Sequence, residues 1–579
     1  MLQFLQTAKS KLTIAGFVCT GLLSGCFEPA PPAEAPTQAT ASRFLHMATF
    51  GPNQTEIDKL VSVGWEAWMT EQFALPLTDS HYDYTSRGGK PGCDTCNASN
   101  DPLLGLQSSF WFQTLEGQDQ LRQRVAFALS ELFVISGDAS SELFDYPDAV
   151  AAFQDVLYQN AFGNFRVILE KVSTHPSMGA MLSHKQNRKE DPITGQLPDE
   201  NYAREVMQLF TIGKWMLNND GTRVKDANGN DVPAYTQSDV MGMAKAMSGW
   251  SWGGDDVSEA RWNGFSLPTG ENPRVWNLQM QAYAQHHSSS EKQLVNGTVI
   301  PAGTDAANSM KIALDALFMH PNAGPFVATH LIKRLVTSNP SPAYVGRVAS
   351  VFSSDKNAVR GNMQAVVRAV LFDPEAHDPA VAAGPTWGKL REPVIRLANY
   401  LRAFNMRNTN GIYPIGLSEP GVYHYGQSPW RAKTVFNFFM PDHQPLGELS
   451  TQNLTAPEFQ IFDESTSAGY VNFMALGVNG VDYAGFAFGG DFTDAGRRLK
   501  ANYTTELALA NNPGALVDRI ALMLNGGYLS AETRSAVIQA LESIPVAAIP
   551  ADKNQAWDRK RVKTAIVMVM SSPDYLIQK

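Results

Sequence analysis

Cysteine is scarce in this chain, with four residues among 579, at positions 19, 26, 93 and 96. Only Cys93 and Cys96 lie beyond the first 26 residues, so no second pair exists to complete a tetrahedral zinc site. No histidine follows Cys96, which excludes covalent haem attachment through this motif. The neighbouring Gly, Pro, Asp and Asn residues indicate a loop. We therefore predict a local structural disulfide between Cys93 and Cys96, with a metal or redox role as the alternative.

Charge is also sparse, at 18% of residues, and the formal net charge is −10. An acidic chain repels phosphate backbones, so we expect no nucleic-acid partner. The chain is 44% hydrophobic, which is enough to bury a large core and too apolar for a disordered protein. No H-E-x-x-H motif occurs, and the sequence predicts no metal and no cofactor.

A long apolar run is missing as well. Leu12 to Leu23 is apolar but shorter than the roughly 20 residues that a membrane-spanning helix needs. Lys9 and Lys11 precede it, and it ends in the tetrapeptide LSGC, which resembles the bacterial lipobox. We expect residues 1–26 to be a lipoprotein signal peptide and Cys26 to be the lipidation site. The alternative is an ordinary signal peptide with an incidental cysteine.

The residues after Cys26 favour a location in the cell envelope. Residues 27–41 are rich in Pro and Ala and are expected to form an extended tether. Phe27 stands where inner-membrane retention would favour Asp, which resembles outer-membrane sorting. We therefore expect an exported protein, anchored through its N-terminal lipid in the cell envelope, with the outer membrane as the expected site.

Helical patterns dominate the remaining sequence. They predict helices at 306–319 and 557–570, helix caps at Asn53 and Thr236, and a helix joint at His175 before Pro176. The expected regions are a helical part with the Cys-x-x-Cys loop (42–250), an irregular aromatic and Gly-rich segment (251–304), a second helical part (305–405), a second irregular segment (406–513) and a C-terminal helical part (514–579). An Asn228–Gly229 turn predicts a small β-hairpin. The expected fold class is mainly α: a large multi-helical globular body with long irregular loops and a small β-hairpin.

Short segments in one order along the chain resemble a known family. They are His175–Met178, Asn187–Lys189, Pro198–Glu205, Leu209–Gly213, Tyr235–Val240, Lys389–Pro393, Gly426–Pro429, Val435–Phe439 and Ser571–Tyr575. The set is similar to the bacterial domain of unknown function 1800. The resemblance implies a helical exported protein and a sulfatase-like exported protein as a partner, but no established activity. The sequence departs from the family pattern at Glu190–Leu197, which lengthens a loop, and at Lys433–Thr434.

The densest polar cluster lies within the central part of that resemblance. Asn201 and Glu205 share one face of a predicted helix, with Arg204 beside them. Arg204 could hold a carboxylate or phosphate with two hydrogen bonds. The favoured alternative is structural, with Arg188 paired to Glu205 so that the pair orders the long loop.

A second group of polar residues lies in the segment 251–304. His286 and His287 are adjacent and point apart in an extended chain, so a shared metal would need Asp255 or Asp256 and is not favoured. Residues 249–253 fit G-x-S-x-G, but no strand precedes them, which indicates a chance match. Trp250 is one of four nearby tryptophans that could stack on sugar rings or fill a core.

Two hypotheses for function follow. The leading one is an envelope lipoprotein that binds a protein partner or a glycan. The alternative is a hydrolase whose candidate polar site has six members: Arg188, Asn201, Arg204, Glu205, His287 and Lys292. The sequence does not decide whether the protein is an enzyme.

Overall fold

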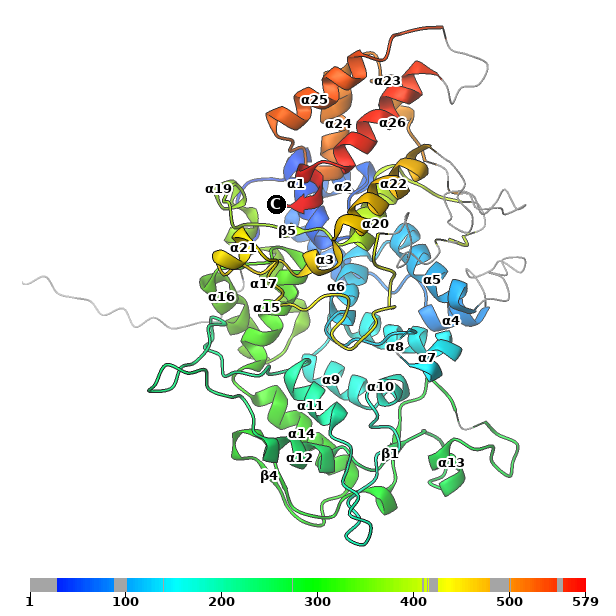
Figure 1. Ribbon diagram of the computed structural model, residues 1–579, viewed down its shortest axis with the longest axis vertical. Helices are drawn as coiled ribbons and strands as arrows, with labels where there is room; N and C mark the ends of the chain where they lie inside the picture. Colours follow the sequence, from blue (N-terminus) through cyan, green and yellow to red (C-terminus); the bar gives the residue numbers. More distant parts are fainter. Residues whose placement is uncertain are drawn as a thin grey trace, which may run out of the picture.

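The computed structural model describes residues 29–87, 102–138, 140–272, 274–408, 411–413, 415, 425–479, 499, 501–548 and 556–579. The expectations for the signal peptide, for lipidated Cys26 and for the Cys93–Cys96 disulfide lie outside the described residues. Figure 1 shows an elongated stack of helices, with the N-terminal helices (blue) beside the C-terminal ones (red) at one end. The mainly α fold class is confirmed.

The first part of the chain is a succession of helices. They are α1 (Gln38–Ala48), α2 (Gln54–Val63), α3 (Trp65–Ala74), α4 (His81–Arg87), α5 (Pro102–Glu116), α6 (Gln120–Ser130), α7 (Ser141–Asp145), α8 (Pro147–Asn160), α9 (Phe165–Ser173) and α10 (Pro176–Met181). Every residue of α6 except Arg122 is buried, so this helix lies within the body of the molecule.

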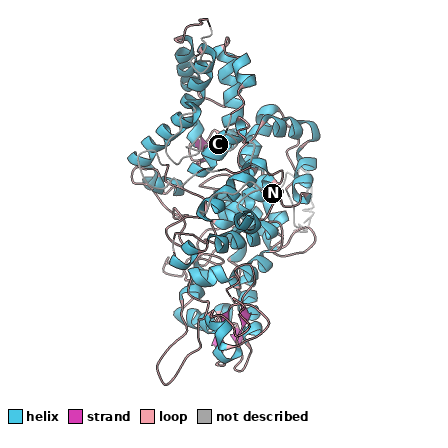
Figure 2. Cartoon of the chain, turned by 90° about the vertical axis from the view of Figure 1, so that its right-hand side faces the viewer, coloured by secondary structure: helices cyan, strands magenta, loops and turns pink. Residues whose placement is uncertain are grey.

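The middle part carries two of the small sheets. Its elements are α11 (Asn201–Gln208), α12 (Gln237–Ala246), β1 (Trp250–Ser251), α13 (Glu259–Asn263), β2 (Gln281–Ala282), η1 (Ala284–His286), β3 (Lys292–Gln293), η2 (Val295–Gly297), β4 (Val299–Ile300), α14 (Ala306–Met319), α15 (Ala323–Leu335), α16 (Pro342–Ser353) and α17 (Met363–Leu371). β1 pairs with β2 and β3 with β4, both antiparallel. Figure 2 shows these strands gathered at one end of the molecule.

The last part of the chain packs against the first part. Its elements are α18 (Pro374–His377), α19 (Pro379–Ala382), β5 (Lys389–Leu390), α20 (Pro393–Ala403), α21 (Glu448–Thr451), η3 (Pro457–Ile461), α22 (Glu464–Asn479), α23 (Thr504–Ala508), α24 (Pro513–Asn525), α25 (Ala531–Glu542), α26 (Trp557–Met570), α27 (Pro573–Leu576) and β6 (Ile577–Gln578). β5 pairs with β6, and Ser42 on α1 donates to the carbonyl of Leu522 on α24. The two ends of the described chain are therefore bound to the same body.

Local sequence explains many of these boundaries. Asn53 accepts a hydrogen bond from the backbone of Glu56 while Glu56 bonds back, so the predicted cap of α2 is a complete capping box. The expected helix ranges 306–319 and 557–570 coincide with α14 and α26. The expected hairpin is present as antiparallel bridges on either side of the Asn228–Gly229 turn, such as Lys225 with Asp231.

Several helices lie where the sequence predicted irregular structure, and α22 is the longest of them. α22 has 16 residues and falls inside the segment 406–513. Its Ser, Thr, Gly and Asn residues are weak helix formers, but Tyr470, Phe473 and Met474 are buried, which indicates that tertiary packing holds the helix. Among the described residues, no helix has the length and apolar character required to cross a membrane.

Candidate functional site

The first four residues of the predicted polar site lie around the start of α11. Arg204 pairs with Glu200 at 3.1 Å and donates to Gln237 at 3.2 Å. Glu205 is only 8% exposed, and its burial raises the pKa, against the attraction of Arg204. Asn201 and Arg188 are exposed, and the Arg188 guanidinium lies over the ring of Trp262. Within the described ranges no ion pair joins Arg188 to Glu205, so the expected structural pair does not form.

The other two residues of that prediction are buried elsewhere. Nδ1 of His287 lies 2.8 Å from the carbonyl oxygen of Ser248, and Nε2 lies 3.0 Å from the hydroxyl of Ser309. The carbonyl can only accept, so Nδ1 carries a proton, and burial lowers the pKa of the ring. Lys292 is 1% exposed and donates to the carbonyl of Ser290. No hydrogen bond or ion pair in the described part of the chain joins these two residues to Arg204 or Glu205.

The neighbouring motifs have structural roles. Ser251 of the G-x-S-x-G match is fully buried and donates to the carbonyl of Trp262, so it presents no nucleophile. His286 lies 2.7 Å from Glu259 and packs against Trp262. His175 caps α10 by accepting from the backbone of Ser177, as its place before Pro176 predicts. The described residues include no cluster of His, Cys, Asp and Glu that could hold a metal ion.

A groove with a polar rim lies between α9, α14 and β1. Its volume is about 370 Å³, which falls in the usual range of ligand sites, roughly 300–1,000 Å³. The residues that line it are Arg166, Glu170, Thr174, Trp250, Ala307, Asn308, Met310, Lys311 and Leu314. The groove therefore combines an aromatic ring and aliphatic side chains with hydrogen-bonding groups.

Helix geometry explains why these side chains meet. Residues 166, 170 and 174 are four apart along α9, and residues 307, 310, 311 and 314 lie on one face of α14. The two helices begin at caps, since Asn164 accepts from the backbone of Arg166 and Asp305 accepts from that of Asn308. The backbone N–H of Met280, near β2, donates to the carbonyl of Thr174, which ties the strand that pairs with Trp250 to the end of α9.

The charges on the groove are balanced. Arg166 pairs with Asp315 at 2.7 Å and with Glu170 at 2.8 Å. Lys311 also pairs with Asp315, at 2.8 Å. Two cations and two carboxylates therefore neutralise each other at the rim, which favours a neutral polar ligand over a phosphate or sulfate.

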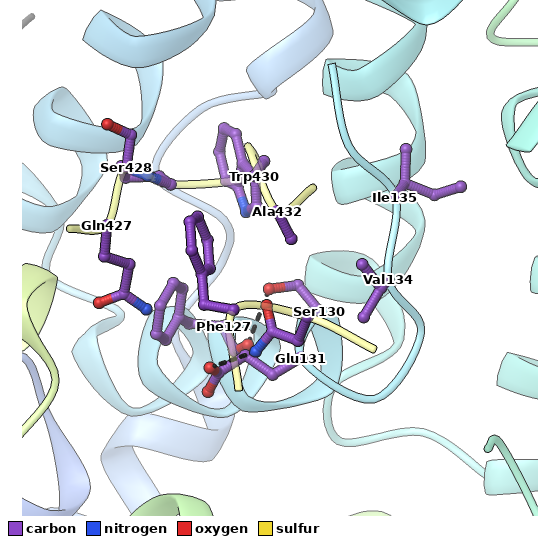
Figure 3. A pocket seen from close by; sticks show the side chains of 12 residues that line it. Phe127, Ser130, Glu131, Val134, Ile135, Gln427, Ser428, Trp430 and Ala432 are labelled. Carbon is purple, nitrogen blue, oxygen red and sulfur yellow. Dashed lines mark hydrogen bonds between the residues drawn. The ribbon is translucent and has the colours of Figure 1, made fainter. Parts of the chain in front are cut away.

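A second, much smaller pocket lies at the end of α6. Figure 3 shows Phe127, Ser130 and Glu131 on the side of the helix, with Gln427, Ser428 and Trp430 on the chain that crosses it. Its volume is about 20 Å³, which is about the space of one water molecule. Trp430 has a φ of 58°, a left-handed conformation that is rare for a bulky residue.

Two carboxyl groups meet beside this pocket. Glu131 is the C-cap of α6 and Glu392 is the N-cap of α20, and the two carboxyl groups interact electrostatically. Asn437 donates to Glu131 at 2.9 Å, and Gln427 donates to Glu392 at 2.9 Å. Glu392 is fully buried and Glu131 is 7% exposed.

Burial raises the pKa of Glu131 to about 8, Arg334 opposes that rise, and Glu392 adds to it. Burial also works to raise the pKa of Glu392, but Lys389, Arg334 and Arg124 together hold it below the ordinary value. The two shifts have opposite directions, so Glu131 is the carboxyl of the pair that binds a proton more tightly.

Sequence reasoning missed both the groove and the carboxyl pair. The pair joins residues 131 and 392, and its bonding partners come from position 427 and beyond, so no local spacing reveals it. A signal did exist: Glu131 interrupts an apolar stretch, and Glu392, Gln427 and Asn437 each lie in a segment that resembles the family.

Comparison with known proteins agrees with the resemblance seen in the sequence. A family model described as "Protein of unknown function (DUF1800)" matches residues 43–577. No curated protein and no solved structure matches the chain.

Proposed function

The chain belongs to the DUF1800 family of proteins of unknown function, so we infer its role from its own residues. We propose that it binds a saccharide at the cell envelope. The observation that carries the proposal is the groove of about 370 Å³ between α9, α14 and Trp250. The lipid at Cys26 and the outer-membrane location belong to the same proposal and rest on the N-terminal sequence.

The chemistry of a sugar ring suits this groove. A sugar presents one or more patches of C–H groups, which pack on aromatic and aliphatic side chains such as Trp250 and Met310. Its hydroxyls both donate and accept, as do the groups offered by Thr174 and Asn308. The balanced ion pairs at the rim supply further donors and acceptors without a net charge.

Saccharide titrations of the full-length lipidated protein in detergent test this proposal. Asn308→Ala and Trp250→Leu are expected to weaken binding of a neutral oligosaccharide by about tenfold or more, equivalent to about 1.4 kcal/mol, since each removes a contact from the groove. Trp215→Leu is the control, because it makes the same side-chain change at a tryptophan that does not line the groove.

Two outcomes would contradict the proposal. One is that no neutral saccharide in a broad panel binds with a measurable Kd. The other is that a saccharide binds equally well to both groove variants and to the control, which would place its site elsewhere on the protein.

The partner protein and the hydrolase remain separate proposals. A sulfatase-like exported partner is supported by the family resemblance, and affinity purification from membranes with and without that protein tests it. The hydrolase hypothesis rests on Arg204 and Glu205, and retained hydrolysis of a glycan or ester panel after Arg204→Ala and Glu205→Ala would contradict it.

A further inference from the structure

The long irregular segment after α20 is held on the body by polar contacts. We call residues 427–462 the cover segment; it contains only the short elements α21 and η3. Besides its bonds to the carboxyl pair, it receives hydrogen bonds from Lys333 on α15 at the carbonyl of Pro441 and at the hydroxyl of Thr455. Glu458 pairs with Lys389 at 3.1 Å.

The backbone of the cover segment is strained at two points beside the pocket. Trp430 and Asn437 have φ values of 58° and 65°. Such residues persist only where surrounding contacts hold them, at a cost of about 1–3 kcal/mol each. The side chain of Asn437 makes one of those contacts itself, by donating to Glu131.

Helix dipoles explain why the shared proton has a fixed place. Glu131 lies at the C-terminal, negative end of α6, where ionisation is unfavourable. Glu392 lies at the N-terminal, positive end of α20, where ionisation is favourable. Oε2 of Glu131 and Oε1 of Glu392 are buried and have no hydrogen-bond donor among the described residues. Arg334 and Lys389 lie 3.7 Å from them, respectively, and a shared proton would satisfy both oxygens.

Glu131 and Glu392 are surrounded by charged groups from the elements that pack around them. They are Arg124 on α6, His330, Lys333 and Arg334 on α15, Lys389 on β5 and Glu458 on η3. His330 has a pKa of about 3, so it stays neutral over the pH range of interest.

We propose that Glu131 and Glu392 form a proton-dependent latch, which holds the cover segment closed over α6 while one proton is shared and loosens it when that proton is lost. In the closed state the shared proton joins the two carboxyls, while Gln427 donates to Glu392 and Asn437 donates to Glu131. Loss of the proton leaves two adjacent carboxylates in a buried site, and separating them moves the groups that anchor the cover segment.

The direction of the pH effect follows from linkage. The pKa of Glu131 is about 8 when the latch is closed, against an ordinary value of about 4.3 when it is open to water. Opening therefore releases a proton between these two values, and the opening constant rises by up to tenfold per pH unit, roughly, before it levels off above about pH 8. Lys333 has a closed-state pKa of about 8, below its ordinary value. Opening therefore adds a proton to Lys333 only above pH 8, and over that range Lys333 lowers the opening constant as the pH rises.

Amide hydrogen exchange in the full chain tests the latch, with rates corrected for the intrinsic pH dependence. In the native protein, protection of the cover segment is expected to fall from pH 5 to pH 8 by up to about tenfold per unit and then to level off. Glu131→Gln keeps a neutral, hydrogen-bonding side chain, so its protection is expected to be independent of pH. Glu448→Gln, an exposed change on the same segment, is expected to behave like the native protein.

Glu392→Gln is a second variant that does not depend on the folding of the first. It removes the neighbouring carboxylate, so protection is expected to level off at a lower pH than in the native protein. The latch is overturned if native protection is flat from pH 5 to pH 8, if Glu131→Gln retains the native slope, or if Glu392→Gln levels off at the same pH as the native protein.

Discussion

At the scale of single residues, the buried charges of this protein are held by hydrogen bonds to fixed partners. Arg402 is 1% exposed and donates to the carbonyls of Gly51 and Thr114 as well as to both carboxylate oxygens of Glu56. Glu56 in turn caps α2, so one guanidinium connects α20 to the start of the chain. Such an arginine positions elements, because its planar group fixes the direction of every bond.

Replacement of Arg402 tests that role. Arg402→Met is expected to lower the free energy of unfolding by about 3–5 kcal/mol, since it leaves a carboxylate and two buried carbonyls without their donor. Urea unfolding measures the loss. Arg534→Met is the control, because the ion pair of Arg534 with Asp518 is exposed and is expected to contribute little to the free energy of unfolding. Equal losses of unfolding free energy in the two variants would contradict the positioning role of Arg402.

The roles of some residues can be predicted from the sequence, and those of others cannot. Asn53 and Thr236 cap helices as predicted, because a cap depends on residues only three positions apart. His175 likewise occupies its expected place at a helix joint. The role of Glu131 depends on a partner more than 250 positions away, and only the folded chain brings that partner into contact.

At the scale of elements, close backbone contact decides where some helices lie. A Cβ atom added at Gly242 on α12 would lie 1.8 Å from the carbonyl oxygen of Gln293 on β3. The helix and the strand therefore approach so closely that only glycine fits. This contact also sets the position of Lys292, the neighbour of Gln293 on the same strand.

Two glycine substitutions distinguish close packing from helix propensity. Gly242→Ala is expected to destabilise the protein by at least about 2 kcal/mol, since two backbones must separate. Gly346→Ala on α16 has its nearest neighbour at 3.7 Å, and is expected to stabilise by about 0.5–1 kcal/mol through helix propensity. Thermal unfolding of both variants measures the difference, and a loss of stability of the same size at both positions would show that packing at Gly242 is not special.

Helices with clear apolar periodicity were the most predictable elements. α14 and α26 follow such a periodicity, with a cap or a tryptophan at the start. α22 is longer but was not predicted, because its Ser, Thr and Gly residues carry little helix signal and its buried face depends on contacts with α26. The groove was not predictable either, since α9 and α14 are about 140 positions apart in the sequence and meet only in the folded protein.

At the scale of the whole molecule, the C-terminal residues lie beside the N-terminal helix α1. Arg43 donates to the backbone carbonyl of Lys579, and β5 pairs with β6. In the proposed arrangement a tether precedes α1, so the lipid at Cys26 would hold one end of an elongated helical body at the membrane.

Lipid labelling tests this anchoring. A palmitate analogue is expected to mark the native protein and not Cys26→Ser, because the thiol is the acylated group. Cys26→Ser is also expected to leave the membrane fraction. Unlabelled native protein, or a Cys26→Ser variant that is still processed and retained in the envelope, would rule out the anchor.

A crystal structure with the tightest-binding neutral saccharide would show whether the groove between α9, α14 and Trp250 holds a sugar. We expect a sugar ring against Trp250 and Met310, with hydroxyls in hydrogen-bond range of Thr174 and Asn308. A saccharide bound on another surface, with this groove occupied only by solvent, would contradict it.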